Sequence, residues 1–131
     1  LSSQDCRNAI RTFQIELIAS MADKLSQIPE GNGTMLDNTL IVYLSDNSAN
    51  HHSFGFEWPM FVLGNLGGKL KSKGRYLAYP HYGTGNHHHT ICNWFTTLCH
   101  LAGSPRDLFG QPDMALGKVD NQQGPLNELL A

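Results

Sequence analysis

One run of six residues constrains the fold more than any other feature of this chain. Residues 39–44, Thr-Leu-Ile-Val-Tyr-Leu, are almost wholly apolar and rich in side chains that favour strands. Continuous rather than alternating hydrophobicity is typical of a strand buried on both faces, as in a parallel sheet that helices cover. The run stops abruptly at Ser45-Asp46-Asn47-Ser48. The sequence therefore predicts a central strand with a polar cluster at its carboxyl end.

Two helices and a second strand are predicted around this run. Residues 5–28 have apolar side chains at helical spacing, which predicts an amphipathic helix capped by Ser3 or Asp5. We expect it to pack through Cys6, Ile10, Phe13, Leu17, Met21, Leu25 and Ile28. Residues 60–63 follow a proline and form a second apolar run, so residues 39–63 hold two core strands joined by a His-rich loop.

The second helix is predicted over residues 89–103, where a glycine ends it. Its apolar face is expected to comprise Ile91, Phe95, Leu98 and Ala102. Residues 64–88 form a long Gly-rich loop region in which residues 75–79 could make a short strand. Residues 104–131 have the composition of an irregular, surface-lying tail with one turn near its end. Helix, strand, strand, helix predicts an α/β fold and a single domain over residues 1–131.

Composition excludes several classes of protein. Nine basic and eleven acidic residues are scattered along the 131 positions and leave a net charge of -2, so we expect no nucleic-acid partner. No apolar run is long enough to span a membrane. The three cysteines, Cys6, Cys92 and Cys99, contain no C-x-x-C motif, and we interpret them as small buried hydrophobic residues.

The polar cluster after the central strand has the chemistry of a metal site. Asp46 offers a carboxylate, Asn47 an amide oxygen, and His51 or His52 an imidazole nitrogen. Asp with Asn suits calcium, whereas Asp with His suits zinc or manganese. A closed site needs further ligands from elsewhere in the chain or beyond it. The alternative is that Asp46 and Asn47 cap a turn through side-chain hydrogen bonds to the backbone.

A second group of histidines comprises His81 and the run His87-His88-His89. Because side chains alternate in an extended chain, His87 and His89 could share a face while His88 points away. The alternative is that these histidines are exposed beside a Gly-rich loop and bind nothing. His100, near the end of the second helix, is expected to be a satisfied packing or surface residue. A Ser48–His52–Asp46 triad lacks the local signature of a nucleophile elbow.

The stretch Leu36-Asp37-Asn38-Thr39-Leu40-Ile41-Val42-Tyr43-Leu44-Ser45-Asp46-Asn47 resembles the late core strand of the sulfatase and alkaline-phosphatase superfamily. In sulfatases that strand ends in an Asp-Asn pair that binds the active-site metal, and Asp46 and Asn47 occupy the matching positions. Glu57-Trp58-Pro59-Met60-Phe61-Val62-Leu63-Gly64 is similar to the next strand, and residues 89–105 are similar to the helix that closes the core. Glycine-containing segments at residues 31–39 and 68–77 resemble the C-terminal half of an uncharacterised bacterial family named for an H-x-x-S-H-H motif.

This resemblance implies a fold and a function. The fold is a partial three-layer α/β/α sandwich, alkaline-phosphatase-like, forming the C-terminal portion of a larger exported domain. The implied metal ligands are Asp46, Asn47, His51 or His52, and His89, around a divalent ion such as calcium or zinc. The chain has Ser48 where sulfatases carry glycine, and it lacks the H-x-x-S-H-H motif and the superfamily's nucleophile segment. We therefore expect that these residues alone do not catalyse.

Two functions from different classes follow. The first is a metal-dependent hydrolase of phosphate or sulfate esters, complete only with the missing N-terminal portion or another chain as partner. The second is a non-catalytic binding or assembly module that retains the fold.

Overall fold

The computed structural model describes residues 2–45, 56–71, 74–84, 88–116 and 122–131. Its elements, in chain order, are α1 (Ser3–Ser26), β1 (Pro29–Glu30), β2 (Gly33–Thr34), β3 (Leu40–Leu44), β4 (Met60–Gly64), α2 (Ile91–Leu101) and the short 3₁₀ helices η1 (Met114–Leu116) and η3 (Asn127–Leu129). Helices and strands occur together, which confirms the α/β class in its general form. Neither described α-helix is both long and apolar enough to cross a membrane.

The two predicted core strands form, but their relative direction differs from the prediction. Strands β3 and β4 pair antiparallel, in a register that runs from Leu40 opposite Gly64 to Leu44 opposite Met60. Ile41 is buried, and the other residues of the two strands are half-buried. The expectation of a parallel sheet buried on both faces was wrong, because continuous hydrophobicity reports burial and carries no information on strand direction.

Helix α1 begins earlier than predicted, because Ser2 rather than Ser3 or Asp5 is the N-cap. The Ser2 side chain accepts from the Asp5 backbone, and the Asp5 carboxylate accepts from the Ser2 N–H at 2.9 Å, which completes a capping box. After the helix, β1 and β2 form a tight two-stranded turn with Gly31 at φ 59°. No strand was predicted in this segment.

The predicted packing face of α1 is exposed. Ile10, Phe13, Leu17 and Met21 are 58, 60, 55 and 44% exposed, and Cys6 is exposed as well. The half-buried residues of the helix are Ile18, Ala22 and Leu25, of which only Leu25 belongs to the predicted face. A hydrogen bond of 2.6 Å from the Tyr43 hydroxyl to Gln14 ties α1 to β3. We call Ile10, Phe13, Leu17 and Met21 the exposed row of α1.

Helix α2 matches its predicted position, with Thr90 as N-cap and Gly103 at φ 77° just beyond its end. Its buried face differs from the predicted one and consists of Asn93, Trp94, Thr96, Thr97 and Leu101. The polar members of this face hold the backbone of the C-terminal tail. The Thr96 hydroxyl accepts from the Phe109 N–H at 3.0 Å, and the Thr97 hydroxyl accepts from the Leu126 N–H at 2.8 Å. Cys92 and Cys99 are half-buried and, like Cys6, are free thiols.

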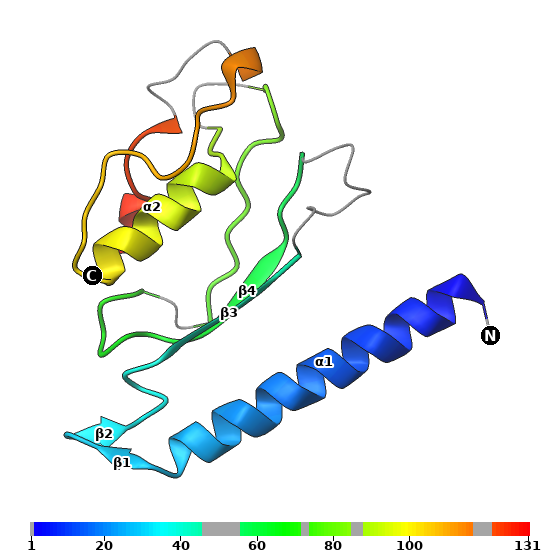
Figure 1. The fold of residues 1–131 in the computed structure, drawn as a ribbon, viewed down its shortest axis with the longest axis vertical. Coiled ribbons are helices and arrows are strands. Elements are labelled where there is room, and N and C mark those ends of the chain that lie inside the picture. Colours follow the sequence, from blue (N-terminus) through cyan, green and yellow to red (C-terminus); the bar gives the residue numbers. More distant parts are fainter. Residues whose placement is uncertain (1, 46–55, 72–73, 85–87, 117–121) are drawn as a thin grey trace.

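The tail is irregular, as predicted, but it is partly buried rather than surface-lying. Gln122 is 1% exposed and Leu126 is 4% exposed. Near its end, the turn predicted from the sequence forms as η3, and Leu130 makes a β-bridge with Leu70 in the segment after β4. In Figure 1 the β3–β4 pair is drawn between α1 on one side and α2 with the tail on the other.

Candidate functional site

A cavity of about 810 Å³ lies among β4, the segment 75–82, the start of α2 and the tail. Seven aromatic side chains line it. They come from residues 56–61, from the segment 75–82 and from α2: Phe56, Trp58, Phe61, Tyr76, Tyr79, Tyr82 and Trp94. Pockets that are mainly apolar with a few placed polar groups are the usual form of a small-molecule site. We take this cavity as the candidate functional site.

The strand pairing brings the end of the central strand beside a residue of the cavity wall. Leu44 is the last residue of β3 and lies opposite Met60, the first residue of β4. Met60 and the preceding Glu57, Trp58 and Pro59 all line the cavity. In the sequence, Leu44 is followed by Ser45 and then by the Asp46-Asn47 pair. The described end of the central strand therefore pairs with a wall residue, and the predicted metal ligands follow it in the sequence.

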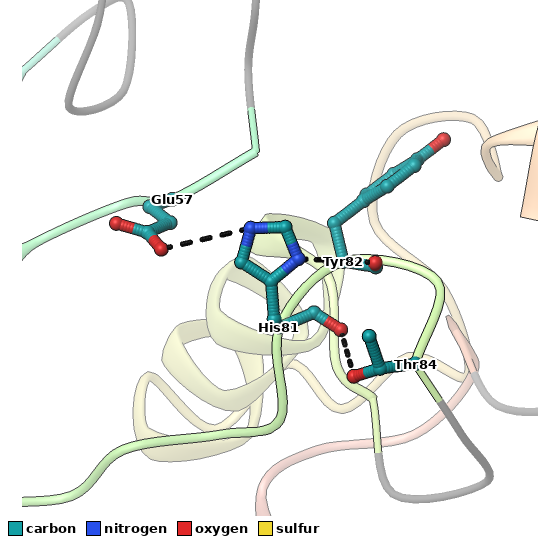
Figure 2. A network of polar contacts seen from close by, with 4 residues as sticks. All are labelled: Glu57, His81, Tyr82 and Thr84. Atoms are coloured by element: carbon teal, nitrogen blue, oxygen red, sulfur yellow. Dashed lines mark hydrogen bonds and ion pairs between the residues drawn. The ribbon is translucent and has the colours of Figure 1, made fainter.

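One polar group on the wall is a histidine with a carboxylate. The His81 Nε2 lies 3.8 Å from a Glu57 carboxylate oxygen, and the His81 Nδ1 lies 3.3 Å from the Tyr82 carbonyl oxygen (Figure 2). The Thr84 hydroxyl donates to the His81 carbonyl and closes the turn that carries the ring. Both side chains of the pair are more than half exposed. A carboxylate beside an imidazole can orient the ring, and imidazole is a common proton carrier in catalysis.

A second polar group joins the segment 75–82 to the tail through Tyr82. Its hydroxyl donates to Asp113 at 2.8 Å, and this bond raises the pKa of Tyr82. The side-chain amide of the buried Gln122 bonds both the N–H and the carbonyl of Asp113, at 2.6 and 2.9 Å. The Tyr82 ring also contacts Phe56 and the edge of His88. This network fixes the aromatic wall in place.

A third polar group surrounds Glu128. The Tyr79 hydroxyl donates to its carboxylate, and the Arg75 guanidinium donates to its carbonyl at 2.9 Å. Burial, followed by this bond, raises the pKa of Tyr79. Burial also acts to raise the pKa of Glu128, but the hydrogen bond from Tyr79 and the positive charges of His89 and Arg75 outweigh it, so this pKa is lowered. The charges in this part of the wall are mutually compensated.

Among the predicted metal ligands, the structure describes His89. It is half-buried, lines the cavity and meets the ring of Tyr79 edge-on, with ring centroids 5.0 Å apart. Asp46, Asn47, His51 and His52 lie outside the described residues, as do Ser48 and His87. Within the described residues, no three His, Cys, Asp or Glu side chains are grouped so that they could hold a metal ion. The prediction of a metal site stays a prediction.

The other described histidines differ in where they lie and in what they contact. His88 is buried at the cavity rather than turned away, and His81 lies on the cavity wall beside Glu57. The His100 Nε2 lies 3.0 Å from the Arg106 carbonyl oxygen, so this ring nitrogen has a partner, as expected of a satisfied packing or surface residue. The predicted strand at residues 75–79 does not form, and this segment is an irregular wall of the cavity.

The aromatic residues of the site were not predicted from the sequence. Three of the chain's four tyrosines, Tyr76, Tyr79 and Tyr82, fall within seven residues of the Gly-rich region. An i, i+3, i+6 spacing of tyrosines without strand alternation was the signal that could have indicated a lined pocket. Trp94 carried no such signal, because a tryptophan in a helix is usually a packing residue.

The chain matches no protein-family model, no curated protein and no solved structure. The evidence for any proposed function therefore comes from the sequence and from the site itself.

Proposed function

We propose that this chain is the C-terminal segment of an exported, sulfatase- or phosphatase-like α/β protein with the three-layer arrangement of that superfamily. In its complete form, the protein hydrolyses a phosphate or sulfate ester with a divalent metal ion, calcium or zinc. The cavity bounded by β4, residues 75–82 and the start of α2 is its substrate pocket.

The observation that carries this proposal is the position of the end of β3. Leu44 lies opposite Met60 on the cavity wall, and His89 lines the same cavity from the start of α2. Ligands for one ion commonly come from separate chain segments that the fold brings together, and the carboxyl end of a strand is a usual place for them. The proposal places Asp46 and Asn47 at this end of the cavity, with His89 and either His51 or His52 completing the protein's share of ligands.

The donor set fits a divalent cation. A carboxylate, an amide oxygen and imidazole nitrogens include ligands for both calcium and zinc. When bound, the ion polarises the ester and activates the attacking group. The residues on the wall supply the rest of the chemistry. In this proposal His81, oriented by Glu57, protonates the leaving alcohol.

Metal content tests this proposal directly. The purified protein, dialysed against zinc or calcium and then against buffer, should retain about one ion per chain by elemental analysis. Asp46→Ala and His89→Ala should each lower this content, because each removes a proposed ligand. Asp23→Ala is the matched control, since Asp23 is an exposed carboxylate on α1 whose loss should leave the content unchanged.

Two results would contradict the proposal. One is a wild-type chain that retains no ion, or that retains the same amount after Asp46→Ala. The other is an esterase rate that survives both EDTA and Asp46→Ala, since the proposed chemistry requires the ion and its ligand.

The alternative, a non-catalytic assembly module, is favoured by the exposed row of α1. Four large apolar side chains on one helical face are each at least 44% exposed, which is typical of a surface that another protein covers. Either the missing N-terminal portion or another chain is the proposed partner. Light scattering after size exclusion should show a complex that Leu17→Glu disrupts and that Thr12→Glu, on another side of the helix, leaves intact. A monomeric wild type at all concentrations would refute assembly between copies.

A further inference from the structure

Two buried nitrogen atoms on the cavity wall, one in His88 and one in Trp94, have no hydrogen-bond partner among the described residues. His88 is 8% exposed and Trp94 is 4% exposed, and both line the cavity. Among the residues that the structure describes, none bonds the His88 Nδ1 or the Trp94 Nε1. Buried polar atoms in native proteins are nearly always paired with protein, water or ligand. An indole N–H can only donate, so the Trp94 nitrogen requires an acceptor from outside the described chain.

Three of the four Asp, Glu, Lys and Arg side chains on the wall have partners, and the fourth, Lys71, is exposed. Arg75 donates to the Lys71 and Glu128 carbonyls at 3.2 and 2.9 Å, and Asp113 accepts from the Tyr82 hydroxyl at 2.8 Å. Glu57 faces His81 across 3.8 Å. A charged ligand would have to displace one of these partners or bind at the exposed Lys71, whereas a neutral ligand at Trp94 and His88 needs neither. The wall therefore favours an uncharged group.

The aromatic lining favours a ring. Tyr76 is 91% exposed, and a tyrosine at the wall of a cavity offers a flat apolar face with little conformational entropy to lose. A saturated ring packs its C–H groups on such faces, and ring hydroxyls can both donate and accept. Hydroxyls thus satisfy the indole N–H of Trp94 and the Nδ1 of His88 in either tautomer.

We infer that the cavity binds an uncharged sugar ring, with one hydroxyl accepting from the Trp94 Nε1–H and another bonded to the His88 Nδ1. This inference names the alcohol part of the proposed ester and rests on the proposed function for that role. Binding of the free sugar, however, needs neither the metal nor hydrolysis.

The test uses the full chain after EDTA treatment, titrated separately with glucose, galactose and N-acetylglucosamine. Indole N–H signals in nitrogen-15 NMR spectra report on the two tryptophans, and Trp94→Phe assigns the Trp94 signal. At least one sugar should shift that signal on binding. By calorimetry, Trp94→Phe should weaken binding about tenfold, which corresponds to the roughly 1.4 kcal/mol of one hydrogen bond.

Two further variants keep the test sharp. His88→Phe retains a buried ring but removes the nitrogen, and it should weaken binding even where Trp94→Phe fails to fold. Tyr43→Phe removes a hydrogen bond to Gln14 outside the cavity and should leave binding unchanged. Each variant is first checked by its thermal unfolding.

The inference is overturned if none of the three sugars shifts the Trp94 signal, or if both cavity variants bind as the wild type does. It is also overturned if benzyl alcohol binds through Trp94 and the sugars do not, because the ligand would then be aromatic. If the protein binds a sugar but retains no metal, the proposed function is contradicted and this inference stands. If it retains a metal but binds no sugar, this inference is contradicted and the proposed function stands.

Discussion

Gly64 at the end of β4 is the position where one added methyl group should do most damage. Its φ is +83°, a conformation that costs a residue with a Cβ roughly 1–2 kcal/mol. A Cβ there would lie 2.1 Å from the Thr39 carbonyl oxygen and 3.0 Å from that of Leu36. Both contacts are to backbone, which moves only if the β3–β4 register moves, and forced overpacking typically costs about 1–3 kcal/mol. Gly64→Ala should therefore lower the free energy of unfolding by about 2–5 kcal/mol.

Gly68→Ala is the matched control. Gly68 has a φ of +88°, almost the same as Gly64, but an added Cβ would meet no atom within 4 Å. Its substitution should cost only the conformational part, roughly 1–2 kcal/mol. The difference between the two variants isolates the collision with Thr39 and Leu36.

Urea unfolding followed by tryptophan fluorescence measures both variants. The midpoint should fall for each, and further for Gly64→Ala, with an unchanged slope if the denatured states are alike. Equal losses in the two variants would refute the reasoning, because the register of β3 against β4 would then not depend on that close approach. Since β4 lines the cavity, any Gly64→Ala protein that stays folded should also lose ligand binding.

Three further substitutions test other parts of the structure. Tyr79→Phe removes the bond that raises the pKa of Tyr79 and helps to lower that of Glu128. The lowered pKa of Glu128 contributes stability above pH 4.5, the ordinary pKa of that carboxyl, and this contribution is lost as the pH falls below it. The raised pKa of Tyr79 contributes stability below pH 10.0, the ordinary pKa of that phenol, and this contribution is lost as the pH rises above it. The urea midpoint of the wild type should therefore exceed that of Tyr79→Phe most between these two pH values, and the two midpoints should converge outside them. Thr97→Val leaves the buried Leu126 N–H without its acceptor and should cost about 1–3 kcal/mol in urea unfolding, whereas no loss would mean that the tail is not held there. Phe13→Glu, at a side chain 60% exposed, should change the stability of the monomer by only about 0.5 kcal/mol, and a loss of several kcal/mol by the same assay would show that the exposed row packs within the chain.

The sequence was a good guide to which segments form elements and a poor guide to what they face. Helix α2 was recognisable from its apolar spacing and from Gly103, and the strand at 40–44 from its unbroken apolar run. The expected face of α2 was wrong because Thr96 and Thr97 are buried for their hydroxyls, which bind the backbone of the tail. Hydrophobic periodicity cannot detect a face that is buried for hydrogen bonding.

The candidate site shows the same division. His89 could be singled out because histidine is a common ligand and the run at 87–89 is unusual in composition. The Tyr79–Glu128 and Tyr82–Asp113 bonds join residues 49 and 31 positions apart, and no local pattern records such pairs. From the sequence, Trp94 would be predicted to be a packing residue of the helix, and only the structure places its indole at a cavity.

What the sequence alone determined is local: the ends of α2, the existence of β3 and β4, and the polar residues that follow the central strand. Local energetics determine these features, because capping, chain stiffness and the solvation of apolar runs act within a few residues. The tertiary structure decided the antiparallel pairing of β3 with β4, the exposure of the Ile10–Met21 side of α1, and the gathering of aromatic side chains around one cavity. Those outcomes depend on contacts between distant segments, whose free energy no single stretch of residues contains.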